Sequence, residues 1–179
     1  MSIALLQALK MEDVEALASA IKTGANVNDF LMPDNSRPLT LTVEYFQCPA
    51  KRHVALNILL AAGADPKLPD DDDEFLGPLF SAMLAQDAVS LQILLAGGAD
   101  PSLEHRGVGQ TLYEAAEFDY LLETWMMELP EQPAEADNIS EEAWLAFLTR
   151  IAAKYGKSKP DCMSVLWSAG AHRSPKKSD

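Results

Sequence analysis

The chain has 179 residues, of which 48% are hydrophobic and 23% are charged, a composition typical of a globular protein and a length that suits one domain. Acidic residues outnumber basic ones 27 to 14, so the net charge is −13, which repels nucleic-acid phosphates and anionic lipid headgroups. Nucleic acid and membranes are therefore excluded as expected partners, and no stretch reaches the roughly 20 apolar residues of a membrane span.

The N-terminal residues and the cysteines indicate a reducing compartment. The apolar run 3–6 has no basic segment before it and is soon followed by Glu12 and Asp13, which does not suit a signal peptide. Cys48 and Cys162 lie far apart and in no metal-like pair, so we expect neither a disulfide framework nor a zinc site. The expected location is cytoplasmic.

Apolar spacing predicts short helices that come in pairs. The first helices of the pairs are expected at 4–9, 39–46, 78–85 and 112–118. Pro38 and Pro78 suit the first turn of such helices, where a missing amide hydrogen costs nothing. The second helices of the clearest pairs end at Gly63 and Gly98, where a left-handed C′ residue is needed, and the Asp-Pro that follows prevents the helix from resuming.

The second helices belong to a repeated motif. Residues 59–66 recur as residues 94–101, 35 positions later, with seven of eight positions identical. Weaker copies lie at 20–26 and 165–171. The glycine spacings are 39, 35 and 72, and the last is about twice a repeat of roughly 33 to 36 residues. We therefore expect a degenerate unit in that gap.

These motifs resemble the ankyrin repeat. The sequence 77–82, the apolar segment 90–95 and the motif 98–101 follow its order of Thr-Pro-Leu-His-x-Ala, an apolar helix and Gly-Ala-Asp, and the resemblance extends over residues 3–129. The usual His is replaced by Thr40, Phe80 and Tyr113. The resemblance implies an all-α fold, an ankyrin-type helical repeat solenoid of about five helix-turn-helix units with an atypical C-terminal cap.

The chain is accordingly expected to form a single ankyrin-repeat domain, 1–173, and the boundaries of its units follow from the motifs. The expected units are 2–36, 37–75, 76–107, 108–138 and 139–173. The second unit carries an insertion, because Pro38 and Pro78 are 40 residues apart whereas the corresponding glycines are 35 apart. The five extra residues are expected around 47–51, where Pro49 should mark a widened loop between the helices. Ser140 offers an N-cap for a helix at 141–154 that closes the stack. The tail 174–179 is expected to be mobile.

Candidate binding residues follow from the position of the loops between units. In the ankyrin family these loops project as hairpins whose tips, with the first helices, form the concave binding face. The first loop presents apolar Phe30 and Met32, which suit a contact surface. The other loop candidates are an acidic run with its adjoining aromatic and a mixed triplet: Asp70, Asp71, Asp72, Asp73, Glu74, Phe75, Glu104, His105 and Arg106.

On the first helices, Tyr45, Glu114 and Glu117 are expected to face the concave side. Aromatic side chains anchor protein interfaces, and unpaired charges steer association. We therefore expect these three residues to contact a partner. For each of them, a solvated surface position is the alternative.

The sequence contains no pattern that predicts catalysis or a cofactor. His53, His105 and His172 have no neighbouring Cys or carboxylate at ligand spacing, and no Ser or Cys is marked as an activated nucleophile. The acidic run 70–74 could supply calcium ligands, but it lacks the alternation and the Gly of a known calcium loop. We expect no enzymatic activity, no cofactor and no bound metal.

The leading hypothesis is a non-catalytic module that binds a protein with a basic surface, as an inhibitor or immunity protein in its narrowest form. The charge excess and the extended face of a repeat fold support this interpretation. A calcium- or ligand-responsive regulator sensing through 70–74 is the alternative, and a scaffold that links two proteins is a third possibility. The oligomeric state stays open, with a monomer favoured.

Overall fold

The computed structural model describes residues 2–31, 35–70, 77–105 and 109–174. Within these ranges the protein is mostly helical, with nine α-helices, one 3-10 helix and one two-stranded sheet. The elements are α1 (Ile3–Lys10), α2 (Val14–Lys22), α3 (Pro38–Tyr45), α4 (Pro49–Ala61), α5 (Pro78–Leu84), α6 (Ala88–Ala96), β1 (Glu104–His105), β2 (Gln110–Thr111), α7 (Leu112–Trp125), η1 (Glu135–Asn138), α8 (Glu141–Tyr155) and α9 (Asp161–Ser168).

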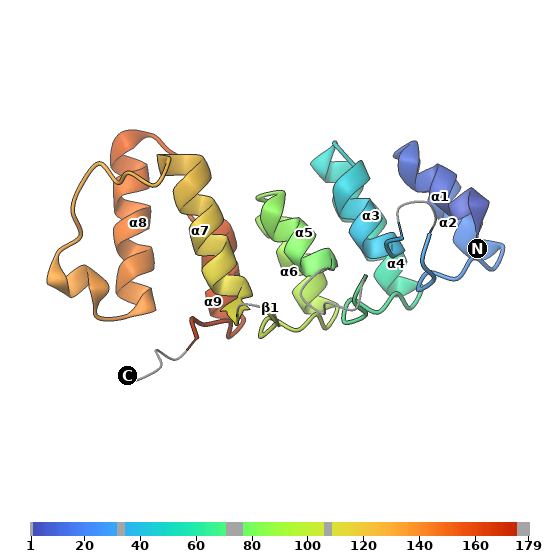
Figure 1. The fold of residues 1–179 in the computed structure, drawn as a ribbon. Helices are drawn as coiled ribbons and strands as arrows, with labels where there is room; N and C mark the ends of the chain where they lie inside the picture. Colours follow the sequence, from blue (N-terminus) through green and yellow to red (C-terminus); the bar gives the residue numbers. More distant parts are fainter. Residues whose placement is uncertain (1, 32–34, 71–76, 106–108, 175–179) are drawn as a thin grey trace.

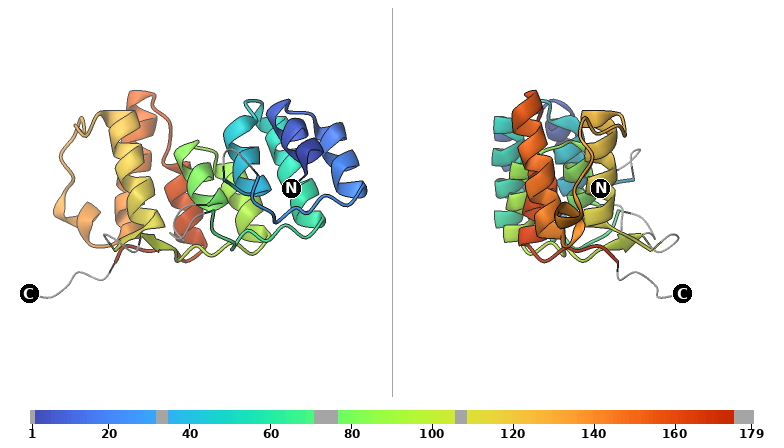
Figure 2. Two further views of the ribbon diagram at one scale, coloured as in Figure 1. Left: turned by 45° about the vertical axis from the view of Figure 1, so that its right-hand side comes forward. Right: turned by 90° about the vertical axis from the view of Figure 1, so that its left-hand side faces the viewer.

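The helices stand side by side in a row that runs from α1 and α2 at one end to α8 at the other (Figure 1). Each of α1, α3 and α5 packs against the helix that follows it. Helices α1, α3, α5 and α7 contact one another in order and form one layer, and α2, α4, α6 and α9 form the second (Figure 2). We call these the first layer and the second layer.

Local sequence signals explain where the helices begin. Pro38 and Pro78 occupy the first position of α3 and α5, as predicted, because the fixed φ of proline suits the first turn. Five other helices begin after a polar N-cap whose side-chain oxygen accepts a backbone N–H. These N-caps are Ser2, Asp13, Asp87, Thr111 and Ser140.

Glycines with a left-handed backbone end the second-layer helices. The φ angles of Gly63 and Gly98 are +89° and +100°, and those of Gly24 and Gly170 are +95° and +94°. An L-residue with a Cβ is strained at these angles. The predicted left-handed helix stops at Gly63 and Gly98 are therefore confirmed.

The extra residues of the second pair lengthen a helix rather than a loop. Helix α4 has 13 residues, whereas α2 and α6 have nine each. Pro49 is the first residue of α4, so the expectation of a widened loop marked by Pro49 is wrong. The reason is that a proline stabilises the first turn of a helix as readily as it interrupts one.

The last helices are arranged differently from two successive units. The sequence placed α7 in the unit 108–138 and α9 in the unit 139–173, but α9 packs against both α6 and α7. It therefore takes the second-layer position beside α7, and η1 and α8 lie between them in the chain. Helix α8 begins after Ser140, as predicted, and stands beside α7 at the end of the row (Figure 1).

Apolar side chains from every helix and the connecting turns form one continuous core. Leu5, Leu56, Leu91 and Leu148 are fully buried along its length. In the described part of the chain, no helix combines the length and apolar character that crossing a bilayer requires. Of the tail 174–179, which is expected to be mobile, the structure describes only Ser174, whose backbone N–H donates to Glu114 Oε1 at 3.1 Å; residues 175–179 lie outside the described residues.

Candidate functional site

The first layer exposes large apolar side chains between acidic ones. Leu84, at the end of α5, is 51% exposed, and Phe118 and Leu122, one turn apart on α7, are 53% and 42% exposed. Gln86 donates a hydrogen bond to Asp119 Oδ2 and so ties the end of α5 to the middle of α7. Single exposed apolar residues are ordinary, but three on neighbouring helices favour a contact surface. We call Leu84, Phe118 and Leu122 the apolar face.

Acidic side chains lie on α7, which carries part of the apolar face, and on α3, which packs against α5. Glu44 and Glu123 are exposed, and Glu44 Oε1 accepts a hydrogen bond of 3.4 Å from Ser81 Oγ, which connects α3 and α5. Asp119 is half-buried, and burial raises its pKa despite the hydrogen bond from Gln86. The combination of exposed apolar groups and carboxylates suits a partner that is apolar in part and positively charged.

Tyr45, one of the predicted contact residues, is half-buried on α3. The ammonium group of Lys10 lies 5.6 Å from the centre of its ring, within the range of a cation–π interaction. Tyr45 therefore joins α1 to α3 and leaves only part of its ring on the surface. Its role in binding a partner stays a prediction.

Glu114 and Glu117 lie on α7, as expected, but the interpretation of these residues as unpaired charges is wrong. Glu114 Oε2 accepts the backbone N–H of Thr111 at 2.8 Å and completes a capping box. Glu117 accepts two hydrogen bonds from the Arg173 guanidinium, one of them 2.9 Å long. Their partners are residues of the same chain, which come from as far as 60 positions away.

Of the two apolar contacts predicted in the first loop, the structure describes one. Phe30 is partly exposed, and the Arg37 guanidinium lies 4.0 Å from the centre of its ring. Arg37 also donates to the carbonyl oxygens of Asn28 and Pro69, so it joins the first loop to the second. Met32 lies outside the described residues.

Asp70 is not part of a solvated acidic loop. Its side chain is buried and accepts the backbone N–H of Arg37 at 2.6 Å and the hydroxyl of Thr40. Burial raises the pKa of Asp70, and these hydrogen bonds oppose the rise only in part. Both carboxylate oxygens are engaged, so the expected surface role of Asp70 is wrong, and it is not available as a calcium ligand. The predicted residues Asp71, Asp72, Asp73, Glu74 and Phe75 lie outside the described residues.

The third loop forms the small sheet. Glu104 pairs with Thr111 and His105 with Gln110 in an antiparallel register. Glu104 is exposed, whereas His105 is half-buried. Arg106, predicted with them, lies outside the described residues. Both described residues of this predicted triplet therefore lie in the strand pair, and of the two only Glu104 is exposed.

A polar cluster that the sequence reasoning missed joins α4 to the turn before α6. Arg52 donates to Asp87 Oδ2 at 2.7 Å and to the Phe46 carbonyl oxygen at 2.9 and 2.6 Å. His53 Nε2 lies 3.0 Å from Asp87 Oδ2, and the backbone N–H and hydroxyl of Ser90 also donate to Asp87. Burial alone would raise the pKa of Asp87, but the hydrogen bonds from Ser90, Arg52 and His53 bring it down to about 2.

The geometry of this cluster does not suit nucleophilic catalysis. Ser90 is buried, and its hydroxyl donates to Asp87 rather than to His53. An activated serine needs a base that can take its proton. The signal that could have revealed the cluster is the spacing, because Arg52 and Asp87 are 35 residues apart, the same offset as the repeated motif.

Both cysteine thiols are free, Cys48 at the surface and Cys162 in the core. Burial, followed by the charges of Asp87, Asp161 and Asp119, raises the pKa of the Cys162 thiol to about 12. Because the thiolate is the nucleophile and the metal ligand, Cys162 is inert at neutral pH. Within the described ranges, no three His, Cys, Asp or Glu side chains lie close enough together to hold a metal ion.

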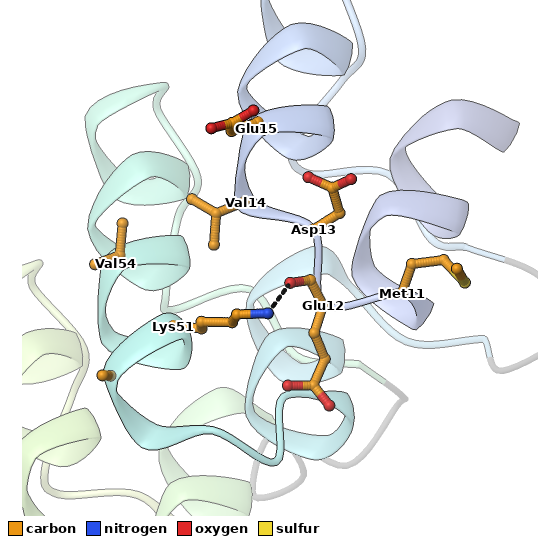
Figure 3. A pocket seen from close by; sticks show the side chains of 8 residues that line it. Met11, Glu12, Asp13, Val14, Glu15, Lys51 and Val54 are labelled. Atoms are coloured by element: carbon orange, nitrogen blue, oxygen red, sulfur yellow. Dashed lines mark hydrogen bonds between the residues drawn. The ribbon is translucent and has the colours of Figure 1, made fainter.

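An open hollow of about 640 Å³ separates the α1–α2 turn from α4 (Figure 3). Glu12, Asp13 and Glu15 lie on one side of it, and Lys51 and Val54 of α4 on the other. Lys51 Nζ donates to the Glu12 carbonyl oxygen at 3.4 Å, and Asp13 accepts the Ala16 N–H as the N-cap of α2. The Lys51–Glu12 contact thus joins the two helix pairs, and the Asp13 side chain caps α2.

The sequence matches no model of a known protein family, and a search of curated proteins returned no match.

Proposed function

We propose that the chain is an ankyrin-type repeat protein that binds a protein partner and catalyses no reaction. The turns between paired helices support the repeat. Glu12 and Gln86 are both left-handed, with φ of 49° and 52°, and each precedes an aspartate that caps the next helix. Left-handed glycines likewise recur after the C-terminal ends of the second-layer helices. In this interpretation α1–α2, α3–α4, α5–α6 and α7–α9 are four units, and α8 is the C-terminal cap.

The observation that carries the binding role is the apolar face with carboxylates beside it. Leu84, Phe118 and Leu122 would bury their exposed area against a partner, and apolar burial contributes about 25 cal/mol per Å². Glu44 and Glu123 would attract a basic rim around that contact, as does the net charge of −13. The partner is therefore a cytoplasmic protein with a basic surface, and occlusion of that surface would make this chain an inhibitor.

A pull-down with a matched pair of variants tests this function. Phe118→Ala/Leu122→Ala removes the apolar face from α7, and Val54→Ala/Val89→Ala removes equally exposed side chains from the second layer. Wild type and the second-layer variant should recover the same stoichiometric protein from native cell extract, and the α7 variant should not. Recovery should fall at roughly 0.5 M salt, where charges are screened. Equal recovery by both variants, or no stoichiometric partner, contradicts the proposal.

A further inference from the structure

The segment that follows α9 crosses over to α7 and α8 and binds three glutamates. His172 Nδ1 lies 2.7 Å from Glu141 Oε2, and the Arg173 backbone N–H donates to Glu141 Oε1 at 2.7 Å. The Arg173 guanidinium forms a two-point contact with Glu117. We call residues 172–174 the strap and the three carboxylates, Glu114, Glu117 and Glu141, the glutamate site.

The glutamate site has the features of an arginine receptor. A guanidinium that faces both oxygens of one carboxylate is held in orientation as well as in place. The Glu117 side chain is only 15% exposed, and the Arg173 side chain is 38% exposed, so the receptor is more enclosed than its occupant. Two backbone N–H groups of the strap are bound as well, by Glu141 and Glu114, which is how an extended peptide is recognised.

A second observation is the buried hydroxyl of Tyr113, the residue that precedes Glu114 in the first turn of α7. Tyr113 is fully buried, and its hydroxyl has no hydrogen-bond partner among the described residues. Burial raises its pKa, and the charges of Glu117 and Glu141 raise it further, while Arg173 opposes them. The charges of Glu117, Glu141 and Arg173 thus all act on this hydroxyl, and the strap forms no hydrogen bond with it. A buried group without a partner costs free energy.

We propose that the glutamate site recognises an arginine-bearing segment of a partner protein and that the strap is an intramolecular occupant that this segment displaces. The proposal rests on the proposed function, because it gives the basic partner a specific point of attachment on α7. A tethered occupant acts at an effective concentration of the order of millimolar. The partner must therefore bind outside the site too, and the part of the apolar face that lies on α7 supplies that contact.

The test supplies the strap as a separate labelled peptide with the sequence of residues 169–179. Arg173→Glu places a carboxylate opposite Glu117 and should release the strap. Arg150→Glu is the matched control, since Arg150 is an exposed arginine whose pair with Asp137 is 3.5 Å long. By fluorescence anisotropy, the peptide should bind Arg173→Glu at least tenfold tighter than wild type or Arg150→Glu. Adding Glu117→Gln should remove that gain. An equal affinity for all variants overturns the proposal.

A measurement on the wild type covers the case in which Arg173→Glu does not fold. Unlabelled peptide at millimolar concentration should speed hydrogen exchange at the backbone N–H groups of Arg173 and Ser174. The N–H of Ala171, which donates to the Leu166 carbonyl, should exchange as before. Unchanged exchange at Arg173 and Ser174 overturns the proposal. Neither experiment uses the natural partner, so a failed pull-down and a failed peptide experiment are separate results.

Discussion

Two arginine–carboxylate contacts join distant parts of this chain, and their surroundings differ. Arg52 and Asp87 connect α4 to α6 in the middle of the row, and both side chains are 10% exposed. Arg173 and Glu117 connect the strap to α7 near the end of the row, and the arginine side chain is 38% exposed. Asp87 also caps α6 and accepts from Ser90 and His53. Arg173, in contrast, caps no helix, because it lies in the segment after α9.

The difference indicates which contact can be exchanged for another. Replacing Arg52 would leave a buried carboxylate without its charged partner, which is costly. Releasing Arg173 exposes groups that water can reach, so the loss is smaller. The central contact therefore belongs to the fold, and the terminal one is suited to competition with a ligand.

The largest expected effect is on the central contact. Asp87→Ala should lower the free energy of unfolding by about 3 kcal/mol or more, because it leaves Arg52 buried without its carboxylate. Asp13→Ala is the matched control, since Asp13 caps α2 with a hydrogen bond to Ala16 but is exposed, and it should cost about 1 kcal/mol. Urea denaturation measures both. Equal losses would show that Arg52 adds nothing beyond the helix cap.

The acid dependence of stability sharpens the same contrast. The folded pKa of Asp87 is about 2, below its ordinary value of 3.8, so the unfolded chain binds this proton more tightly. The stability from ionised Asp87 is therefore present above about pH 4 and is lost as the pH falls through about 2. The gap between wild type and Asp87→Asn in urea denaturation should narrow from pH 5 to pH 2.5. A constant gap contradicts the assignment.

Asp70 provides a comparison of opposite sign. Its pKa is raised by burial, so its contribution is present below 3.8 and is lost as the pH rises through the folded pKa. The stability of wild type relative to Asp70→Asn should therefore decline from pH 3 to pH 7. The stability of wild type relative to Asp87→Asn should instead grow as the pH rises from 3. Parallel changes in the two gaps would mean that the two buried aspartates do not differ as described.

Local signals predicted the helices, and long-range contacts decided the roles of the charged residues. Pro78, Gly98 and Ser140 act within one turn of their own helix, so their effects could be predicted from neighbouring residues. The burial of Asp70 depends on Thr40 and Arg37, which are 30 and 33 positions away. Its position in a run of acidic residues gave no indication of that burial.

The same limit explains the C-terminal part of the molecule. The glycine spacing of 72 predicted a missing unit, but it could not indicate that α9 would pack beside α7 while α8 stands at the end. The position of Glu117 on a first helix predicts a contact with a partner, but its partner in the structure, Arg173, lies 56 residues later in the same chain. Glu117 therefore belongs to the glutamate site, but the sequence did not predict that Arg173 occupies it.

The smallest expected effect tests the terminal contact. Arg173→Ala should lower the free energy of unfolding by less than about 1 kcal/mol, because a partly exposed ion pair gains little over water. The loss should shrink toward zero in roughly 1 M salt, where exposed charges are screened within a few ångströms, whereas the Asp87→Ala loss should persist because buried pairs are screened much less. Urea denaturation at low and high salt measures both. If Arg173→Ala costs as much as Asp87→Ala at either salt concentration, the strap is part of the fold in the same sense as the central contact, and its exchange for a partner's arginine would require partial unfolding of the α7 end.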